Sequence, residues 1–228
     1  MNGSNNMSIK LRCALILAMT GVCLRAAEAP PETPGGSKPT EPPSQQPAAD
    51  AIWQGAVGGG FGRAAQSLSV EGGASRGLAV FGSRQQHDLA LGSVSYGHIL
   101  SRVQGEGHWY RGNWEARAEL LGGAQFSPKN EWLAGMAAHL RYDFATGSRL
   151  VPFVDVGAGV TGTGIREPDL SSVFEFNLQG GGGLHWFFRD DVALTFEFHI
   201  LHLSDAEITS PNLGANGVLG TVGLTRFF

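Results

Sequence analysis

From Ala51 onward, hydrophobic and polar positions alternate along the chain with a period of two. Between Val173 and Phe188, the even positions are mostly apolar and carry aromatic rings at both ends of the run. The odd positions of the same run include Glu175, Asn177 and His185. Because successive side chains of a β-strand point to opposite faces, the pattern predicts a strand with one apolar and one polar face.

Similar runs recur along the chain, and each is about as long as the 9 to 11 residues that a tilted strand needs to cross a membrane. The apolar faces end in aromatic residues, and the polar faces carry both signs of charge, as the lumen of a small barrel would. We predict eight strands, at 51–62, 88–99, 109–125, 132–145, 150–163, 172–188, 191–204 and 217–228. The predicted fold is therefore all-β, an eight-stranded antiparallel transmembrane β-barrel.

The connections between these runs differ in length. The turns at 145–149 and 189–191 are short, whereas 63–87 and 205–216 are long. Short periplasmic turns and longer outer loops are typical of barrels in the outer membrane of Gram-negative bacteria. We therefore expect the barrel to lie in the outer membrane. We expect no porin channel, because side chains fill the interior of an eight-stranded barrel.

The N-terminal part of the chain has a different composition. Lys10 and Arg12 precede an apolar stretch at 13–24, which small residues follow. This order predicts a secretory signal peptide at 1–29, with lipidation at Cys23 as the alternative. Residues 30–50 are rich in Pro, Ser, Gln and Gly and are expected to form a disordered linker, which leaves 51–228 for the barrel.

Composition and charge narrow the choice of function. The chain has 34 Gly, 13 Phe and 5 Trp, and a net charge of −4. Such a charge gives no reason to expect a nucleic-acid partner. The histidines show no spacing specific to zinc, and the glycines at 180–183 lie inside a strand rather than in a phosphate-binding loop. We therefore expect neither a metal nor a cofactor.

His202 and Ser204 form the candidate site. Along 191–204, the even positions make up the membrane-facing row, and both residues continue that row toward the end of the strand. A histidine beside a serine on one face can accept the hydroxyl proton and so activate a nucleophile for acyl transfer. Histidine and serine are also ordinary residues at a membrane interface, so the pair alone leaves both interpretations open.

The stretch "HLSDAEITSPNLGAN", residues 202–216, resembles the signature of the lipid A 3-O-deacylase (PagL) and acyloxyacyl hydrolase family. That signature reads roughly His-x-Ser-Asn-Ala, then an apolar residue, then Pro-Asn-x-Gly. Residues 140–160 and 174–198 also resemble segments of this family. The resemblance implies a carboxylic ester hydrolase in the outer membrane that removes an ester-linked acyl chain from lipid A of lipopolysaccharide, with no metal.

Carried over residue by residue, the resemblance makes His202 the general base and Ser204 the nucleophile. Ala206 matches the residue that neighbours the oxyanion position in the family. The family's loop scaffold is matched by Pro211, Asn212 and Gly214. Backbone N–H groups near Ser204 to Ala206 would then hold the oxyanion.

Two positions depart from the family pattern. Asp205 stands where the pattern has an Asn that helps to form the oxyanion hole, and a carboxylate there would repel a developing oxyanion. Asn216 stands where the best-known members have a Glu as the acid of the triad. Asn can orient an imidazole by a hydrogen bond but stabilises an imidazolium less well. Asn216 is the expected third member, with Asp205 and Glu207 as alternatives.

Two functions from different classes follow. The first is a lipid A deacylase that uses His202, Ser204 and Asn216, with lipid A and the outer membrane as its partners. The alternative is a non-catalytic barrel that acts in surface adhesion or envelope integrity. The sequence leaves open which acyl position is cut and whether the barrel is a monomer or a homodimer.

Overall fold

The computed structural model describes residues 62–166 and 168–228. The predicted signal peptide and the predicted linker lie outside the described residues, as do residues 51–61. No helix long and apolar enough to cross a membrane occurs in the part of the chain that the structure describes.

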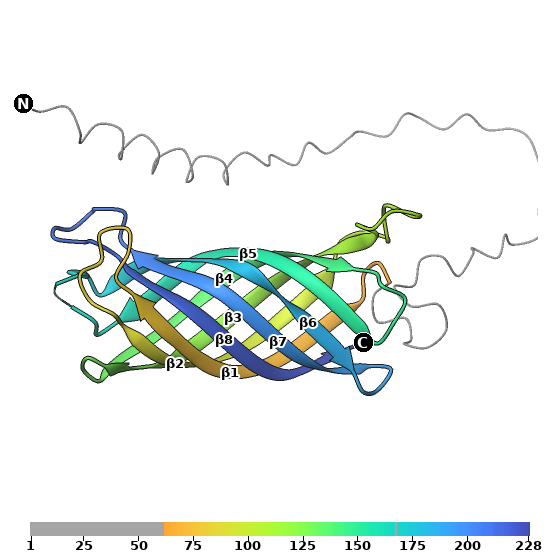
Figure 1. The fold of residues 1–228 in the computed structure, drawn as a ribbon, viewed down its shortest axis with the longest axis horizontal. Helices are drawn as coiled ribbons and strands as arrows, with labels where there is room; N and C mark the ends of the chain where they lie inside the picture. The colour runs from red at the N-terminus through yellow and green to blue at the C-terminus, as the bar shows by residue number, and fades with distance from the viewer. Residues whose placement is uncertain (1–61, 167) are drawn as a thin grey trace, which may run out of the picture. The chain divides into compact units, whose positions relative to one another are not determined.

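The described residues form a closed antiparallel barrel in which each strand pairs with its neighbours in sequence and β1 pairs with β8 (Figure 1). The strands are β1 (Gln66–Leu78), β2 (Asp88–Ile99), β3 (Gly112–Ser127), β4 (Glu131–Phe144), β5 (Leu150–Thr163), β6 (Phe174–Phe187), β7 (Val192–Ser204) and β8 (Ala215–Phe227). The predicted eight-stranded barrel is confirmed. Closure pairs every strand on both sides, so no strand edge is left unbonded in the membrane.

The position of the first strand was predicted wrongly. β1 spans Gln66–Leu78 and lies inside the segment 63–87, which was expected to be a loop. Glycines at 72, 73 and 77 and small serines interrupt the apolar alternation of this strand, so its hydrophobic signal is weak. The other seven strands lie within a few residues of their predicted bounds.

Alternation places apolar side chains on the outer wall and polar side chains in the lumen. On β7, Phe196, Phe198 and Ile200 are exposed, whereas Thr195 and His199 between and beside them are buried. Aromatic rings are exposed near both ends of the wall, at Phe126, Trp132 and Phe174 toward one end and at Tyr96, Trp114 and Trp186 toward the other. Such a band with two aromatic girdles is the expected surface of a barrel that crosses a membrane.

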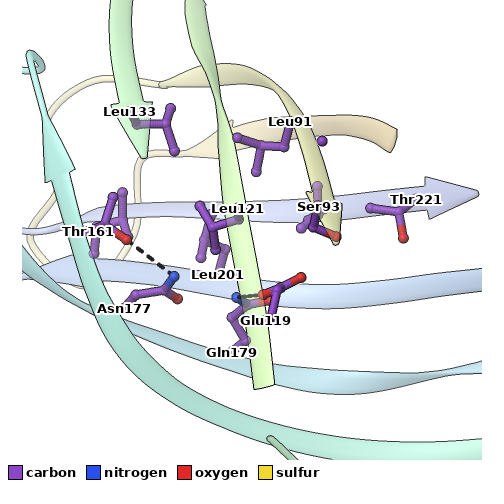
Figure 2. Close-up of a pocket in the computed structure, with 13 residues that line it drawn as sticks. Leu91, Ser93, Glu119, Leu121, Leu133, Thr161, Asn177, Gln179, Leu201 and Thr221 are labelled. Atoms are coloured by element: carbon purple, nitrogen blue, oxygen red, sulfur yellow. Dashed lines mark hydrogen bonds between the residues drawn. The ribbon is translucent and has the colours of Figure 1, made fainter. Parts of the chain in front are cut away.

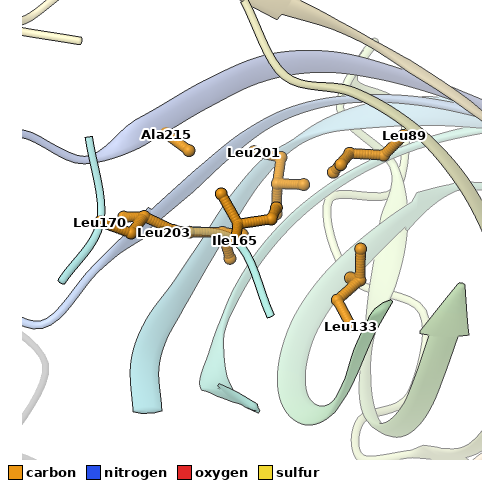
Figure 3. Packing of buried hydrophobic residues seen from close by; sticks show 7 residues of the cluster. All are labelled: Leu89, Leu133, Ile165, Leu170, Leu201, Leu203 and Ala215. Atoms are coloured by element: carbon orange, nitrogen blue, oxygen red, sulfur yellow. The ribbon is translucent and has the colours of Figure 1, made fainter. Parts of the chain in front are cut away.

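The lumen is filled in three layers. One apolar cluster closes each end: Ile99, Val151, Phe187, Phe227 and neighbours at one end, and Leu89, Leu133, Ile165, Leu170, Leu201, Leu203 and Ala215 at the other (Figure 3). Buried charged residues lie between the two clusters. The barrel therefore has a packed interior, as expected for eight strands.

The two ends of the barrel carry different connections (Figure 1). The site end, as we call it, carries the connections 79–87, 128–130, 164–173 and 205–214. The terminal end carries 100–111, 145–149 and 188–191, together with the beginning of β1 and the end of β8. The chain leaves β7 at Ser204 and enters β8 at Ala215, so the candidate residues gather at the site end.

Candidate active site

His202 and Ser204 lie on the outward-facing row at the end of β7, as the alternation predicts. The register of the β7–β8 pair places Asn216 directly opposite His202. The Nε2 atom of His202 lies 3.0 Å from Ser204 Oγ, and its Nδ1 atom lies 2.7 Å from Asn216 Oδ1. The imidazole therefore bridges a hydroxyl and an amide oxygen, the arrangement in which a histidine can act as a base toward serine.

The side chain of Asn216 is fixed by the loop that follows β1. Its Nδ2 group donates a 2.9 Å hydrogen bond to the backbone carbonyl of Val80, and the residue is 6% exposed. A carbonyl only accepts, so the amide nitrogen must face Val80 and the amide oxygen must face His202. That oxygen accepts from Nδ1–H, which leaves the lone pair of Nε2 directed at the Ser204 hydroxyl.

Gly214 packs directly against the imidazole. Its φ is +80°, in the left-handed region that favours glycine. A Cβ at this position would lie 2.8 Å from Cε1 of His202, closer than van der Waals contact allows. The glycine therefore allows both the turn of the chain into β8 and the close approach of the loop to the ring.

The other predicted loop residues have separate positions. Asn212 is buried and donates from Nδ2 to Glu175 Oε2 at 3.0 Å, which ties the loop to the beginning of β6. Pro211 is exposed. Ala206 and Glu207 both have positive φ, 59° and 67°, and begin the tight turn after β7. Two successive non-glycine residues in this region are unusual and often accompany functional sites.

Asp205 is hydrogen-bonded within the turn that follows β7. One carboxylate oxygen accepts a 2.9 Å hydrogen bond from the Thr209 N–H and a second from the Thr209 hydroxyl. The other oxygen has no hydrogen-bond partner among the residues that the structure describes. Of the three residues that the sequence offers as the partner of His202, the one hydrogen-bonded to it is thus Asn216, whereas Asp205 caps the turn at 205–209.

The buried charges of the lumen form a network separate from this site. Arg141 is paired with Asp155 at 2.8 Å and with Glu197, and Arg117 lies 3.0 Å from Glu197. His199 lies 2.7 Å from Asp155. Asp155, Glu197 and His199 bring possible ligand atoms within 4.8 Å of one another, but two guanidinium groups already neutralise these carboxylates. The arrangement favours an ion-pair network over a cation site.

A small cavity lies beside this network in the lumen (Figure 2). Apolar side chains such as Leu121 and Leu201 line one part of it, and hydrogen-bonded polar pairs line the other. Gln179 donates to Glu119 at 3.1 Å, and Asn177 donates to Thr161 at 3.3 Å. These polar pairs lie inside the barrel, whereas His202 lies on the outer wall.

Sequence reasoning missed Val80, Asp169 and His87. Val80 acts through a backbone carbonyl, which leaves no signal in the sequence. Asp169 and His87 are fully or almost fully buried in the connections of the site end, at 0% and 3% exposure. A buried aspartate and histidine in predicted loops were the only available signal, and burial cannot be recognised before the loops are placed.

Comparison with known proteins adds to this geometry. The model of the family described as lipid A 3-O-deacylase (PagL) matches residues 77–225, a range that includes His202, Ser204 and Asn216. No curated protein matches the chain in sequence.

Several solved structures share the barrel. The crystal structure of Neisserial surface protein A (NspA) has a TM-score of 0.52 and 13% identity, over 72% of this chain and 97% of that chain. The outer membrane enzyme PagL has a TM-score of 0.48 and 16% identity, over 69% and 97%. Ail of Yersinia pestis has a TM-score of 0.44 and 11% identity, over 73% and 99%. At these identities the likeness to NspA shows the fold alone.

Proposed function

The chain belongs to the lipid A 3-O-deacylase (PagL) family and is an outer-membrane β-barrel, and from this premise we propose that it is a serine esterase that removes an ester-linked acyl chain from lipid A. Ser204 is the proposed nucleophile, His202 the general base and acid, and Asn216 the residue that orients His202. The family's description names the 3-O position, and we propose the same ester bond for this chain.

The observation that carries the proposal is the continuous hydrogen-bonded series from Ser204 through His202 to Asn216, at 3.0 and 2.7 Å. Both distances lie within the range of about 2.6 to 3.2 Å over which a general base can accept a proton. Because Asn216 accepts from Nδ1–H, the Nε2 atom is free of hydrogen and can take the proton of the Ser204 hydroxyl.

The chemical steps follow from this arrangement. Ser204 Oγ attacks the acyl carbonyl carbon while its proton moves to His202 Nε2. Collapse of the tetrahedral intermediate breaks the ester bond, and His202 returns the proton to the sugar oxygen that leaves. Water then attacks the acyl-serine with His202 again as the base, which releases the fatty acid and restores Ser204.

The turn after β7 is the proposed oxyanion site. Backbone N–H groups between Ser204 and Ala206 lie next to the nucleophile, and the positive φ of Ala206 and Glu207 directs the chain sharply at this point. Backbone donors that are fixed before the reaction stabilise a developing oxyanion at no cost of reorganisation. With Asp205 bonded to Thr209, its carboxylate is held by the turn rather than by Ser204 or His202.

The surroundings of Ser204 suit an acyl chain. Phe176 on β6 is directly paired with Ser204 in the sheet and forms an edge-on contact with Phe174. Phe81 and Ile208, in two loops of the site end, are 78% and 73% exposed. We propose that the site end faces the outer leaflet, where these apolar groups meet the acyl chains and the polar loops meet the sugars of lipid A.

Mass spectrometry of lipid A from cells that express the chain, beside cells that express Ser204→Ala, tests this function. We expect the loss of one hydroxyacyl chain with the intact serine and no loss with the variant. Ser148→Ala, which removes an exposed hydroxyl from the turn 145–149 at the terminal end, should behave like the unaltered chain.

Unmodified lipid A from all three strains, with folded barrel present and with the same result after lysis in detergent, would exclude deacylation. It would favour the non-catalytic alternative, a small barrel that acts in adhesion or envelope integrity. The detergent step matters because an esterase whose substrate is kept away in the intact membrane would also leave lipid A unmodified.

A further inference from the structure

Asp169 links the loops of the site end through an unusual number of hydrogen bonds. It lies in the β5–β6 connection, and its side chain is completely buried. One carboxylate oxygen accepts from the Arg84 N–H at 2.6 Å, and the other accepts from the Gln85 N–H at 2.8 Å and from the Ser83 hydroxyl at 3.1 Å. A buried carboxylate requires such partners, and here all three come from the β1–β2 connection.

The same bonds hold the carboxylate in its ionised form. Burial opposes ionisation, but the N–H groups of Arg84 and Gln85 and the His87 ring more than compensate, and the pKa of Asp169 is lowered from its ordinary value. The group is therefore a fixed negative charge under neutral conditions, to which several donors are directed.

His87 extends the network to a third connection. Its Nε2 atom lies 2.9 Å from Asp169 Oδ2, and its Nδ1 atom lies 2.6 Å from Gln125 Oε1. Gln125 in turn donates from Nε2 to the carbonyl of Lys129 at 2.8 Å, so its oxygen must face His87. Both nitrogens of the ring thus face oxygen atoms of neighbouring side chains.

The backbone of Asp169 holds the fourth connection. Its carbonyl accepts from the N–H of Leu213 at 2.8 Å and from the N–H of Gly214 at 3.2 Å. Asp169 is thus bonded directly to the connections 79–87 and 205–214, and it is linked to the connection 128–130 through His87 and Gln125.

Two of these connections contact the catalytic histidine and its partner. The connection 79–87 supplies the Val80 carbonyl that fixes the amide of Asn216. The connection 205–214 supplies Gly214, which packs against the His202 ring. In addition, His87 and Asn216 line the same small cavity beneath the loops, so the network and the site share a wall.

We propose that Asp169, with His87, is a positioning residue for the reaction: it holds the two loops that set the orientation of Asn216 and His202. The inference rests on the proposed function for its role in the reaction, but the structural link to His202 is independent of it. The barrel itself is held by its strand ladders, whereas the hydrogen bonds of the Asp169 side chain all go to the β1–β2 connection, which ends at His87.

The test uses Asp169→Asn in the full-length chain, refolded in detergent micelles. The amide turns one acceptor into a donor, which then faces N–H groups, so the bonds to the β1–β2 connection cannot all form. The matched control is Asp143→Asn, which makes the same replacement at another completely buried aspartate, at the terminal end of β4. A second variant, His87→Gln, covers the case in which Asp169→Asn fails to fold. Heat-modifiable mobility in electrophoresis reports the folded fraction of each.

Two readouts are expected to change together. The first is deacylation, in which kcat should fall at least tenfold with a smaller change in KM, because the substrate surface remains while the base is misaligned. The second is the ¹⁵N spectrum of the His202 ring. A ring held by Asn216 should give one tautomer with hydrogen on Nδ1 in the unaltered chain, and a mixture in Asp169→Asn.

Several outcomes would overturn the proposal. One is a folded Asp169→Asn or His87→Gln with unaltered kcat and an unaltered His202 spectrum. Another is an equal loss in Asp143→Asn, because the effect would then follow from any missing buried carboxylate. If the unaltered chain shows no deacylation while the His202 spectrum still changes in Asp169→Asn, the proposed function fails and the positioning link stands.

Discussion

Removal of the Asn216 amide is the most direct test of how the candidate site works. In Asn216→Ala, His202 loses the acceptor that lies 2.7 Å from its Nδ1 atom, and Val80 loses the donor that lies 2.9 Å from its carbonyl. The barrel should still form, because the ladder between β7 and β8 uses backbone groups alone. Ser204 and His202 both remain, so the change addresses orientation and charge at the imidazole.

The size of the effect follows from the bond that is lost. During attack by Ser204 the imidazole becomes an imidazolium, and a hydrogen bond that involves a charged group contributes about 1.5 to 3 kcal/mol. At about 1.4 kcal/mol for each tenfold change in rate, kcat should fall by about 10- to 150-fold. Activity should stay measurably above that of Ser204→Ala, which lacks the nucleophile.

The assay is the initial rate of fatty-acid release from purified lipid A in detergent, with Asn216→Asp as the isosteric control. Asp retains an oxygen toward His202 and should be more active than Ala but less active than the unaltered chain. It also places a carboxylate oxygen where Nδ2 meets the Val80 carbonyl, so its folded loops should be less stable. A rate for Asn216→Ala equal to that of the unaltered chain would refute the assignment of Asn216 as the residue that orients His202.

Three further predictions follow from other parts of the structure. Gly214→Ala should lower kcat about 10- to 100-fold, because its Cβ would displace the His202 ring; Gly147→Ala, which has a similar φ of 72° but open space around it, should leave the rate unaltered. Since the pKa of Asp169 is lowered by folding, its stabilisation of the loops should be complete above about pH 4 and be lost only as the pH falls further. Protection of the amides at 83–87 against hydrogen exchange, relative to their intrinsic rates, should therefore fall in acid in the unaltered chain, and this acid-dependent fall should be missing in Asp169→Asn. Asp155→Ala should lower the free energy of unfolding in urea by about 3 to 5 kcal/mol, because it removes the buried carboxylate that Arg141 and His199 share, and a loss below about 1 kcal/mol would contradict the role of the ion-pair network.

Much of the barrel could be predicted from the sequence because a strand that separates lipid from a filled lumen must alternate. From β2 to β8 the outward rows carry large apolar residues, and the period of two is strong enough to place most strand ends within a few residues. β1 lacked this signal, since its outward row includes Gly72 and Ala74 and its inward row consists largely of serines and one Glu. The pairing that identifies β1 as a strand comes from β2 and β8, which are distant in sequence.

The candidate site, like the barrel, could be predicted only in part. His202 and Ser204 could be placed on one face because their spacing within a strand determines their relative direction. That Asn216 meets His202 depends on the register between β7 and β8, which the parity of the closing strand only suggested. The roles of Val80, Asp169 and His87 could not be predicted, because they depend on how four connections fold over the end of the barrel.

The choice of Asn at position 216 has a local physical explanation. The side chain has to satisfy two neighbours at once, a ring N–H that donates and a backbone carbonyl that accepts. An amide offers an acceptor on one side and a donor on the other, whereas an ionised carboxylate offers acceptors on both and would leave the Val80 carbonyl opposed to a negative oxygen. In this barrel, an uncharged Asn beside the imidazole, in place of the family's Glu, thus fits the position of the β1–β2 connection, which Asp169 and His87 hold. Replacing Asn216 by an acid should therefore require a shift of that connection before the carboxylate can assist His202.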